Sequence, residues 1–304
     1  MKLVDLLHQA ANLEGKIVAV AGANDREVIA AVIEAVKRKL ATFLLFGPRD
    51  EIEALLEKEE PVGNYKIIQA RTKEQAAELA VRSVHHNEAD VLMKGNIATS
   101  IILKAVLNKE YGLRTGRVLS HVAVFDIDGF EYCKIVTDAG MNINPDLEQK
   151  KQIILNAVEV ANAIGIKMPT VAPLAAVETV NPSMQATMDA ALLTQMNRRG
   201  QIKGCIIDGP LALDNAISWE AAKQKNIESD VAGKANILLV PSIEAGNILY
   251  KSLVYFAKAD VGGIIAGAKA PIVLTSRADH AKSKLYSLAL AICTSEITAS
   301  LKED

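Results

Sequence analysis

The sequence predicts an α/β fold with two lobes, in which mostly parallel sheets are flanked by helices. Apolar runs of strand length alternate with longer segments of helical periodicity, and short connections join them. Half of the 304 residues are apolar but only 4% are aromatic, so the core must consist mainly of Val, Ile, Leu and Ala, as in buried parallel sheets. A chain of this length is long for one compact unit and suits two lobes.

The predicted elements follow one another in strand–helix order. Apolar runs predict strands at residues 17–21, 42–46, 65–69, 91–93, 123–125, 133–136, 171–175, 204–207, 237–240, 263–266 and 272–274. Helical periodicity predicts helices at residues 25–40, 73–86, 147–164, 181–198 and 245–258, and a further helix from about residue 281. The turn signal Asp126-Ile-Asp-Gly129 predicts an antiparallel hairpin, which we interpret as the mark of a second lobe. Asn144 or Pro145 can start the helix at residues 147–164, with Asp146 and Glu148 favourably placed in its first turn.

Composition excludes several classes of function. The net charge of −2 gives no electrostatic reason to bind nucleic acid or a membrane surface. The five histidines form no metal-ligand spacing, and Cys133, Cys205 and Cys293 are interpreted as reduced core thiols. The chain begins without a charged-then-apolar leader, and no apolar run approaches about 20 residues. We therefore expect a cytoplasmic protein with no metal, membrane or nucleic-acid partner.

The segment from Ala270 to Asp279 predicts an anion site. A short buried strand ends at Thr275-Ser-Arg277, and a helix begins shortly afterwards. The first turn of a helix presents unpaired N–H groups and the positive end of its dipole, and Arg277 can grip two oxygen atoms at once. This combination indicates a phosphate or phospho-cofactor.

The sequence of a second loop indicates that it binds the same anion. In Lys94-Gly-Asn-Ile-Ala-Thr99 a glycine follows a strand end, where it permits a close backbone approach, and we expect Thr99 and Lys104 on the first turns of the next helix. Gly22-Ala-Asn24 lacks the remainder of a dinucleotide fingerprint and is interpreted as a structural turn. Polar residues at other strand ends, such as Asp208 and Glu244, lie where open α/β sheets bind ligands.

The ordered motifs resemble the phosphate acetyl/butyryltransferase family, and its phosphate butyryltransferase branch most closely. The resemblance is carried by Lys94-Gly95 with Thr99, Leu119-Ser-His-Val-Ala-Val-Phe125, Thr137-Asp-Ala-Gly-Met-Asn-Ile-Asn-Pro145, Asp208-Gly-Pro-Leu-Ala-Leu-Asp214, Val231-Ala-Gly-Lys-Ala-Asn-Ile-Leu-Leu-Val-Pro241, Glu244-Ala-Gly-Asn247 and Ser276-Arg277. It implies an isocitrate-dehydrogenase-like pair of lobes, residues 1–118 plus 264–304 and residues 119–263, with the active cleft between them. It also implies a homodimer or higher homo-oligomer.

The reaction implied by the resemblance is butanoyl-CoA plus phosphate giving butanoyl phosphate plus CoA, reversibly. Ser276 and Arg277 match the pair that holds phosphate and stabilises developing charge in the family. Gly95, Asn96 and Thr99 belong to its phosphate loop, and Ser276-Arg277 is expected to return to face that loop. Lys104 stands where acetyl-type relatives carry an arginine, so it keeps the charge but not the bidentate fork. CoA is then a substrate, and no tightly bound cofactor is expected.

The sequence does not decide which residue acts as the general base. Acetyl-type relatives carry an aspartate seven residues after the serine, and here that position is Ser283. Asp279 is the nearest carboxylate, and His121 has an ordinary pKa close to neutrality. A CoA thiolate stabilised by Lys282 and Lys284, without a discrete base, is the third interpretation.

Other functions fit parts of the sequence. A phosphate acetyltransferase, or another enzyme for short or branched acyl chains, would use the same motifs. An NAD-dependent hydroxyacid dehydrogenase could share the scaffold, although the dinucleotide fingerprint is missing. The serine at position 283 also permits a non-catalytic protein that binds CoA or phosphate.

Overall fold

The computed structural model describes residues 1–59, 63–274 and 280–300, with side chains described up to residue 296 in the last of these ranges. The chain divides into two compact units. Unit 1 consists of Met1–Lys2 and Val118–Val261, and unit 2 of Leu3–Arg117 and Gly262–Asp304. The sequence analysis expected its lobes to divide at residues 118/119 and 263/264.

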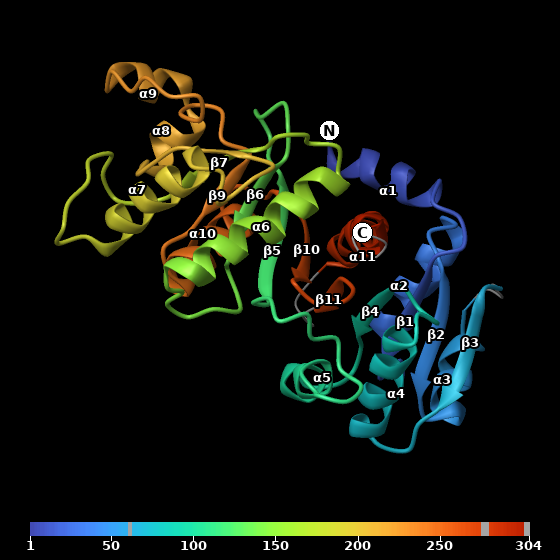
Figure 1. Ribbon diagram of the computed structural model, residues 1–304. Coiled ribbons are helices and arrows are strands. Elements are labelled where there is room, and N and C mark those ends of the chain that lie inside the picture. Colours follow the sequence, from blue (N-terminus) through green and yellow to red (C-terminus); the bar gives the residue numbers. More distant parts are fainter. Residues whose placement is uncertain (60–62, 275–279, 301–304) are drawn as a thin grey trace. The chain divides into compact units, whose positions relative to one another are not determined.

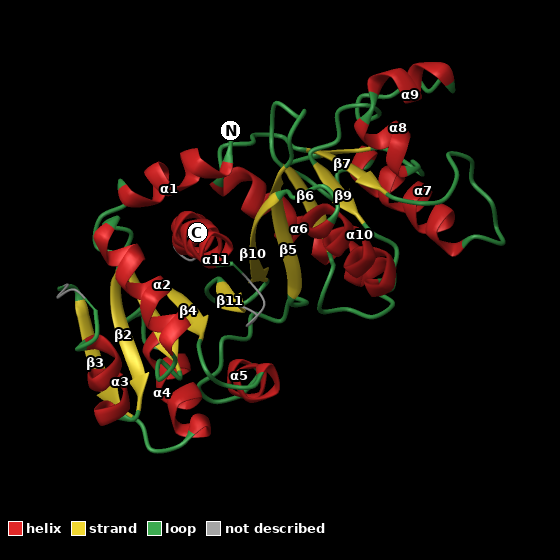
Figure 2. Ribbon diagram, turned by 180° about the vertical axis from the view of Figure 1, so that it is seen from behind, coloured by secondary structure: helices red, strands yellow, loops and turns green. Residues whose placement is uncertain are grey.

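Unit 2 is built on a sheet in the order β3-β2-β1-β4-β11-β10. Its strands are β1 Ile17–Ala21, β2 Thr42–Gly47, β3 Tyr65–Gln69, β4 Val91–Lys94, β11 Ile272–Leu274 and β10 Asp260–Ala266, whose first two residues belong to unit 1. All neighbouring strands are parallel except β10, which runs antiparallel to β11. The strands are rich in Val, Ile and Leu because helices cover the sheet (Figures 1 and 2).

The helices of unit 2 form two groups. They are α1 Leu3–Ala11, α2 Arg26–Lys37, α3 Arg49–Leu56, α4 Lys73–His85, α5 Thr99–Val106 and α11 Ala281–Ser300. One group contains α4, which packs on β1, β2 and β4, and α5, which packs on α4. In the other group α11 packs against α1, α2, β4 and β11. The helix that comes after β11 in the chain is therefore fixed to the centre of the sheet.

Unit 1 is built on a sheet in the order β5-β6-β9-β7-β8. Its strands are β5 Ser120–Asp126, β6 Lys134–Thr137, β7 Thr170–Pro173, β8 Ile206–Ile207 and β9 Ile237–Leu239. Its helices are α6 Leu147–Ala163, α7 Gln185–Arg198, α8 Leu213–Ile217, α9 Trp219–Gln224 and α10 Ile243–Tyr255. An apolar cluster joins the β5, β6 and β9 side chains Phe125, Val136 and Leu238 to α10.

The structure confirms the predicted α/β class and the predicted hairpin. β5 and β6 are antiparallel, with Val122 opposite Thr137 and Phe125 opposite Lys134. The other paired strands of unit 1 are parallel. β5 is longer than the predicted strand at residues 123–125, since it begins at Ser120. β6 lies one residue later than the predicted strand at residues 133–136 and ends at Thr137.

The helix α6 begins at Leu147, as the periodicity predicted, but the residues expected to start it were wrong. Asp146, rather than Asn144 or Pro145, is the residue that caps the helix. The Asp146 carboxylate accepts the N–H of Gln149 at 2.8 Å, and the Gln149 side chain accepts the N–H of Asp146 at 2.9 Å. This reciprocal pair satisfies two N–H groups at once, which a cap at Asn144 or Pro145 would not do.

Candidate functional site

The predicted phosphate loop lies at the carboxyl end of the central strand of unit 2. β4 is flanked by β1 and β11, and its last residue, Lys94, is paired with Ala21 and Leu274. The loop that begins at Gly95 thus starts beside the end of β11. Thr275 follows Leu274 directly in the sequence, but Ser276, Arg277 and Asp279 lie outside the described residues.

Gly95 is required by the approach of the chain's own backbone. A Cβ atom at this position would lie 2.2 Å from the carbonyl oxygen of Gly22. The N–H of Gly95 donates to Ala21 O at 2.8 Å, and that of Asn96 donates to Gly22 O at 2.7 Å. The Asn96 side chain donates to Asn24 O at 3.4 Å. Two loops at the ends of β1 and β4 are therefore joined, and any larger residue at position 95 would separate them.

The first turn of α5 is open to an anion. Its N-cap residue, Ala98, has no side-chain oxygen, and the Ala98 carbonyl accepts the N–H groups of Ile101 and Ile102. Thr99 and Ser100 are exposed at this end of the helix, where the first N–H groups have no partner within the helix and the dipole has its positive end. This is the arrangement by which helix ends bind phosphate.

Lys104 is not on the first turns of α5, as the sequence analysis expected, but in its last turn. It is exposed and follows Thr99 by five residues, which places it about 7.5 Å farther along the helix and about 140° around it. Ser100, four residues before Lys104, shares its face instead. A ligand held by Thr99 and Lys104 together must therefore reach around the helix.

Lys94 was considered in the sequence only as the residue before Gly95. Its ammonium group donates to Gly95 O at 3.2 Å and to Ile97 O at 3.3 Å. The side chain thus folds over the loop that it precedes. The sequence alone does not predict this side-chain conformation, because a lysine at the end of a strand usually extends into solvent.

The two lysines beside Ser283 have different environments. Lys284 is 4% exposed and forms an ion pair with Glu27 at 2.6 Å, which joins the first turns of α11 and α2. Lys282 is exposed and lies over the ring of Tyr286, with its ammonium 5.6 Å from the ring centre. The charge of Lys284 is therefore engaged within the protein, and Lys282 is better placed to act on a thiolate in solvent.

His121, in unit 1, is held at both backbone groups. Its N–H donates to Asp138 Oδ1 at 3.2 Å, and its carbonyl accepts the hydroxyl of Thr137 at 2.8 Å. The imidazole is half-buried and packs against the Tyr250 ring, with 5.8 Å between the ring centres. A Cβ atom at Gly140 would lie 3.7 Å from the His121 side chain, so even a small side chain at this position would touch His121.

Asp138 organises the loop after β6. Its carboxylate is 2% exposed and accepts five N–H groups. Oδ1 accepts from the backbone of His121, Gly140 and Met141 at 2.9–3.2 Å, and Oδ2 accepts from the Asn142 backbone at 3.1 Å and side chain at 2.6 Å. The Asn142 side chain also donates to Leu119 O, at 2.8 Å. The sequence analysis assigned this motif mainly to helix capping and did not identify the buried carboxylate.

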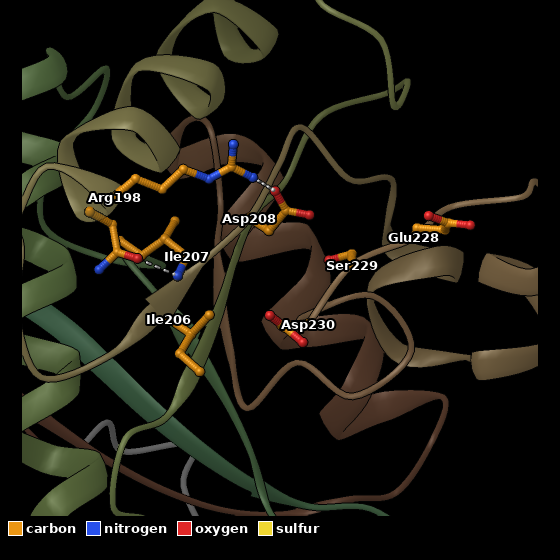
Figure 3. Close-up of a pocket in the computed structure, with 8 residues that line it drawn as sticks. Arg198, Ile206, Ile207, Asp208, Glu228, Ser229 and Asp230 are labelled. Carbon is orange, nitrogen blue, oxygen red and sulfur yellow. Dashed lines mark hydrogen bonds and ion pairs between the residues drawn. The ribbon is translucent and has the colours of Figure 1, made fainter.

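Figure 3 shows a cavity of about 450 Å³ in unit 1, at the end of the edge strand β8. Arg198 Nη2 lies 3.6 Å from Asp208 Oδ1. Three carboxylates and one guanidinium make the lining acidic, so it disfavours phosphate. Of the residues singled out in the sequence, Asp208 lines this cavity, whereas the described residues predicted to bind phosphate or to act in catalysis do not. The lining residues are Asn197, Arg198, Ile206, Ile207, Asp208, Glu228, Ser229 and Asp230.

Neither metal ligands nor the thiols of Cys205 and Cys293 give an alternative site in the described part of the chain. Among the residues placed by the structure, no group of three or more His, Cys, Asp or Glu side chains could hold a metal ion. Burial raises the pKa of Cys205 to about 11 and that of Cys293 to about 12, so both thiols are protonated at neutral pH and are poor nucleophiles. No helix in the described ranges is both long and apolar enough to cross a membrane.

Comparisons with known proteins identify the family. The family described as Phosphate acetyl/butaryl transferase matches residues 64–292. The chain is 60% identical to the probable phosphate butyryltransferase of Bacillus subtilis (strain 168), over 97% of this chain and 99% of that protein. It is 49% identical to the phosphate acetyltransferase of Thermotoga maritima, over 95% of this chain and 98% of the relative.

A solved structure agrees with these sequences. The branched-chain phosphotransacylase of Enterococcus faecalis V583 superposes with a TM-score of 0.81 at 34% identity, covering 92% of this chain and 99% of that one. The resemblance noted in the motifs is confirmed along nearly the whole chain, which therefore belongs to the phosphate acetyl/butyryl transferase family and is an acyltransferase.

Proposed function

We propose that the protein transfers a butanoyl group reversibly between CoA and inorganic phosphate. The observation that carries this proposal is the 60% identity to the probable phosphate butyryltransferase, which exceeds the 49% identity to the acetyl-type relative. The open first turn of α5 beside the end of β11 supports a phosphate site at the loop from Gly95 to Thr99. CoA and butanoyl-CoA are then substrates, and no tightly bound cofactor takes part.

In the proposed reaction the CoA thiolate attacks the carbonyl carbon of butanoyl phosphate. A tetrahedral oxyanion forms, the carbon–oxygen bond to phosphate breaks, and phosphate leaves as butanoyl-CoA is released. Ser276 and Arg277 hold the phosphate and stabilise the oxyanion, since fixed donors aimed at developing charge lower the barrier most. Gly95, Asn96 and Thr99 orient the phosphate, and Lys104 contributes charge from the end of α5.

The proton of the CoA thiol requires an acceptor. Asp279 and His121 are the two candidate bases, and His121 is held by its backbone contacts with Thr137 and Asp138. The third possibility is a CoA thiolate that is stabilised by lysine without a discrete base. It depends on Lys282, because Lys284 is paired with Glu27. Replacement of each in turn, with the pH profile of kcat/KM as the readout, identifies the group whose loss removes the ascending limb.

A panel assay tests the proposed function. Purified protein is mixed with phosphate and acyl-CoA substrates from two to six carbons, and the released thiol is measured. We expect phosphate-dependent turnover with the highest kcat/KM for butanoyl-CoA. Absence of turnover across the panel together with tight CoA binding would identify a non-catalytic binder, and reduction of NAD by hydroxyacids would identify a dehydrogenase. A higher kcat/KM for acetyl-CoA or a branched substrate would show that the proposed preference for the butanoyl group is wrong.

The proposal also includes a cytoplasmic homodimer or higher homo-oligomer without nucleic-acid or membrane partners. Support comes from the net charge of −2 and from the 88% exposure of the Phe256 side chain at the end of α10. Light scattering coupled to gel filtration measures the assembly, and a monomeric mass at micromolar concentration would contradict it.

A further inference from the structure

We propose that Lys94 is a phosphate-binding residue of this site, an inference that rests on the proposed function. Its place in the sheet is the first argument. β4 lies between β1 and β11, and Lys94 is opposite both Ala21 and Leu274. The carboxyl ends of these three parallel strands meet at one edge, where open α/β sheets bind their ligands. Lys94 is the central residue of that edge.

The conformation of the side chain is the second argument. The Lys94 ammonium is bound to the carbonyl oxygens of Gly95 and Ile97, at 3.2 and 3.3 Å. Ile97 is followed by Ala98, the N-cap residue of α5. The positive charge is thus held next to the first turn of the helix, where Thr99 and Ser100 are exposed. An ammonium and a helix end that lie together attract the same anion.

The surrounding carboxylates are the third argument. Three acids at the starts of the neighbouring elements α2 and α3 have contacts of their own. Asp25 accepts the N–H groups of Glu27 and Val28 at the start of α2, and Glu27 is paired with Lys284. On α3, Glu51 accepts the side-chain N–H of Asn24 at 2.8 Å. The charge of Glu27 is thus balanced by Lys284, and the contacts of Asp25 and Glu51 hold their carboxylates at the helix starts.

The KM values for the two substrates distinguish phosphate binding by Lys94 from a purely structural role in which Lys94 only stabilises the loop. Lys94→Gln removes the charge but keeps an N–H donor for the loop carbonyls. Lys66→Gln is the matched control, because Lys66 is exposed on the edge strand β3 and loses the same charge. For each protein, the KM for phosphate is measured at saturating butanoyl-CoA, and the KM for butanoyl-CoA at saturating phosphate.

We expect Lys94→Gln to raise the KM for phosphate about 10- to 100-fold, the loss of one charge-assisted hydrogen bond, with the KM for butanoyl-CoA within about twofold of wild type. Lys66→Gln leaves both KM values unchanged. A folded Lys94→Gln protein with a normal KM for phosphate overturns the proposal. If Lys94→Gln does not fold, Lys94→Arg replaces it: a selective rise in the KM for phosphate supports the proposal, and equal changes in both KM values overturn it.

A measurement without turnover distinguishes this inference from the proposed function. Millimolar phosphate is added to each protein and the thermal midpoint is recorded, because a ligand that binds the native state raises it. We expect phosphate to stabilise wild type and Lys66→Gln but not Lys94→Gln. Equal stabilisation of all three overturns the role of Lys94. An inactive wild type that phosphate still stabilises through Lys94 refutes the proposed function alone.

Discussion

The buried carboxylate of Asp138 receives five N–H groups, so its replacement by asparagine has a calculable effect. The two donors at Oδ2 both come from Asn142. If the carbonyl oxygen of the introduced asparagine side chain occupies the position of Oδ1, its NH₂ group faces these two donors and both hydrogen bonds are lost. A hydrogen bond to a charged acceptor contributes about 1.5–3 kcal/mol, so Asp138→Asn should lower the free energy of unfolding by about 3–6 kcal/mol.

Two further variants calibrate this value. Asn142→Ala leaves the backbone donors in place but removes two side-chain hydrogen bonds, to Asp138 Oδ2 and to Leu119 O, so we expect a loss of about 2–4.5 kcal/mol. Asp128→Asn makes the same chemical change at an exposed position of the hairpin turn, and we expect an effect within about 0.5 kcal/mol.

Urea unfolding at pH 7 measures all three variants. Trp219 is the single tryptophan of the chain and lies in unit 1 with Asp138, so its fluorescence reports the relevant transition. Far-UV circular dichroism follows the whole chain in parallel. A loss below about 1 kcal/mol in Asp138→Asn would contradict this value, because it would mean that the two Asn142 N–H groups find equivalent acceptors without the carboxylate.

Three other substitutions test separate parts of the account. Arg277→Ala should lower kcat/KM by about 100-fold or more, as loss of an electrostatic stabiliser does, and an activity within about threefold of wild type would exclude the assigned role. Lys150→Met leaves the buried Asp189 without its ion-pair partner at 2.6 Å, so it should lower the free energy of unfolding, measured with urea, by about 3–5 kcal/mol. The double variant Lys150→Met, Asp189→Leu should largely restore this stability. The hydrogen bond from Lys225 lowers the pKa of Glu178 below its usual 4.5, so the stability it contributes is present above that pH and is lost as the pH falls. The thermal midpoint of wild type should therefore exceed that of Lys225→Met at pH 7, with a difference that shrinks below pH 4.5; a difference independent of pH would contradict the assignment.

Local patterns were sufficient to predict most of the framework. Residues 65–69 form a strand with the predicted bounds because apolar β-branched side chains and flanking polar residues specify it locally. The hairpin follows from Asp126-Ile-Asp-Gly129, and α11 begins at Ala281 as the periodicity indicated. The cap of α6 was misassigned because Asn144 and Asp146 are both good capping residues. The contact with Gln149 decides between them.

Contacts between distant residues could not be predicted in this way. Lys284 and Glu27 are 257 positions apart, and only the packing of α11 beside α2 brings them together. Gly95 was expected to admit a close neighbour, but nothing in the sequence identified that neighbour as Gly22. The Asp138 carboxylate also depends on tertiary structure, because its donors include His121 from another strand.

The most direct test of the central claim identifies the products. Butanoyl-CoA, inorganic phosphate and the purified protein are incubated, and ³¹P NMR follows the phosphorus-containing species while free thiol is titrated. The account predicts that butanoyl phosphate and CoA appear in equal amounts and that added CoA reverses the reaction. Release of CoA with butanoate and no acyl phosphate would show hydrolysis by water instead of transfer to phosphate, and would contradict the account.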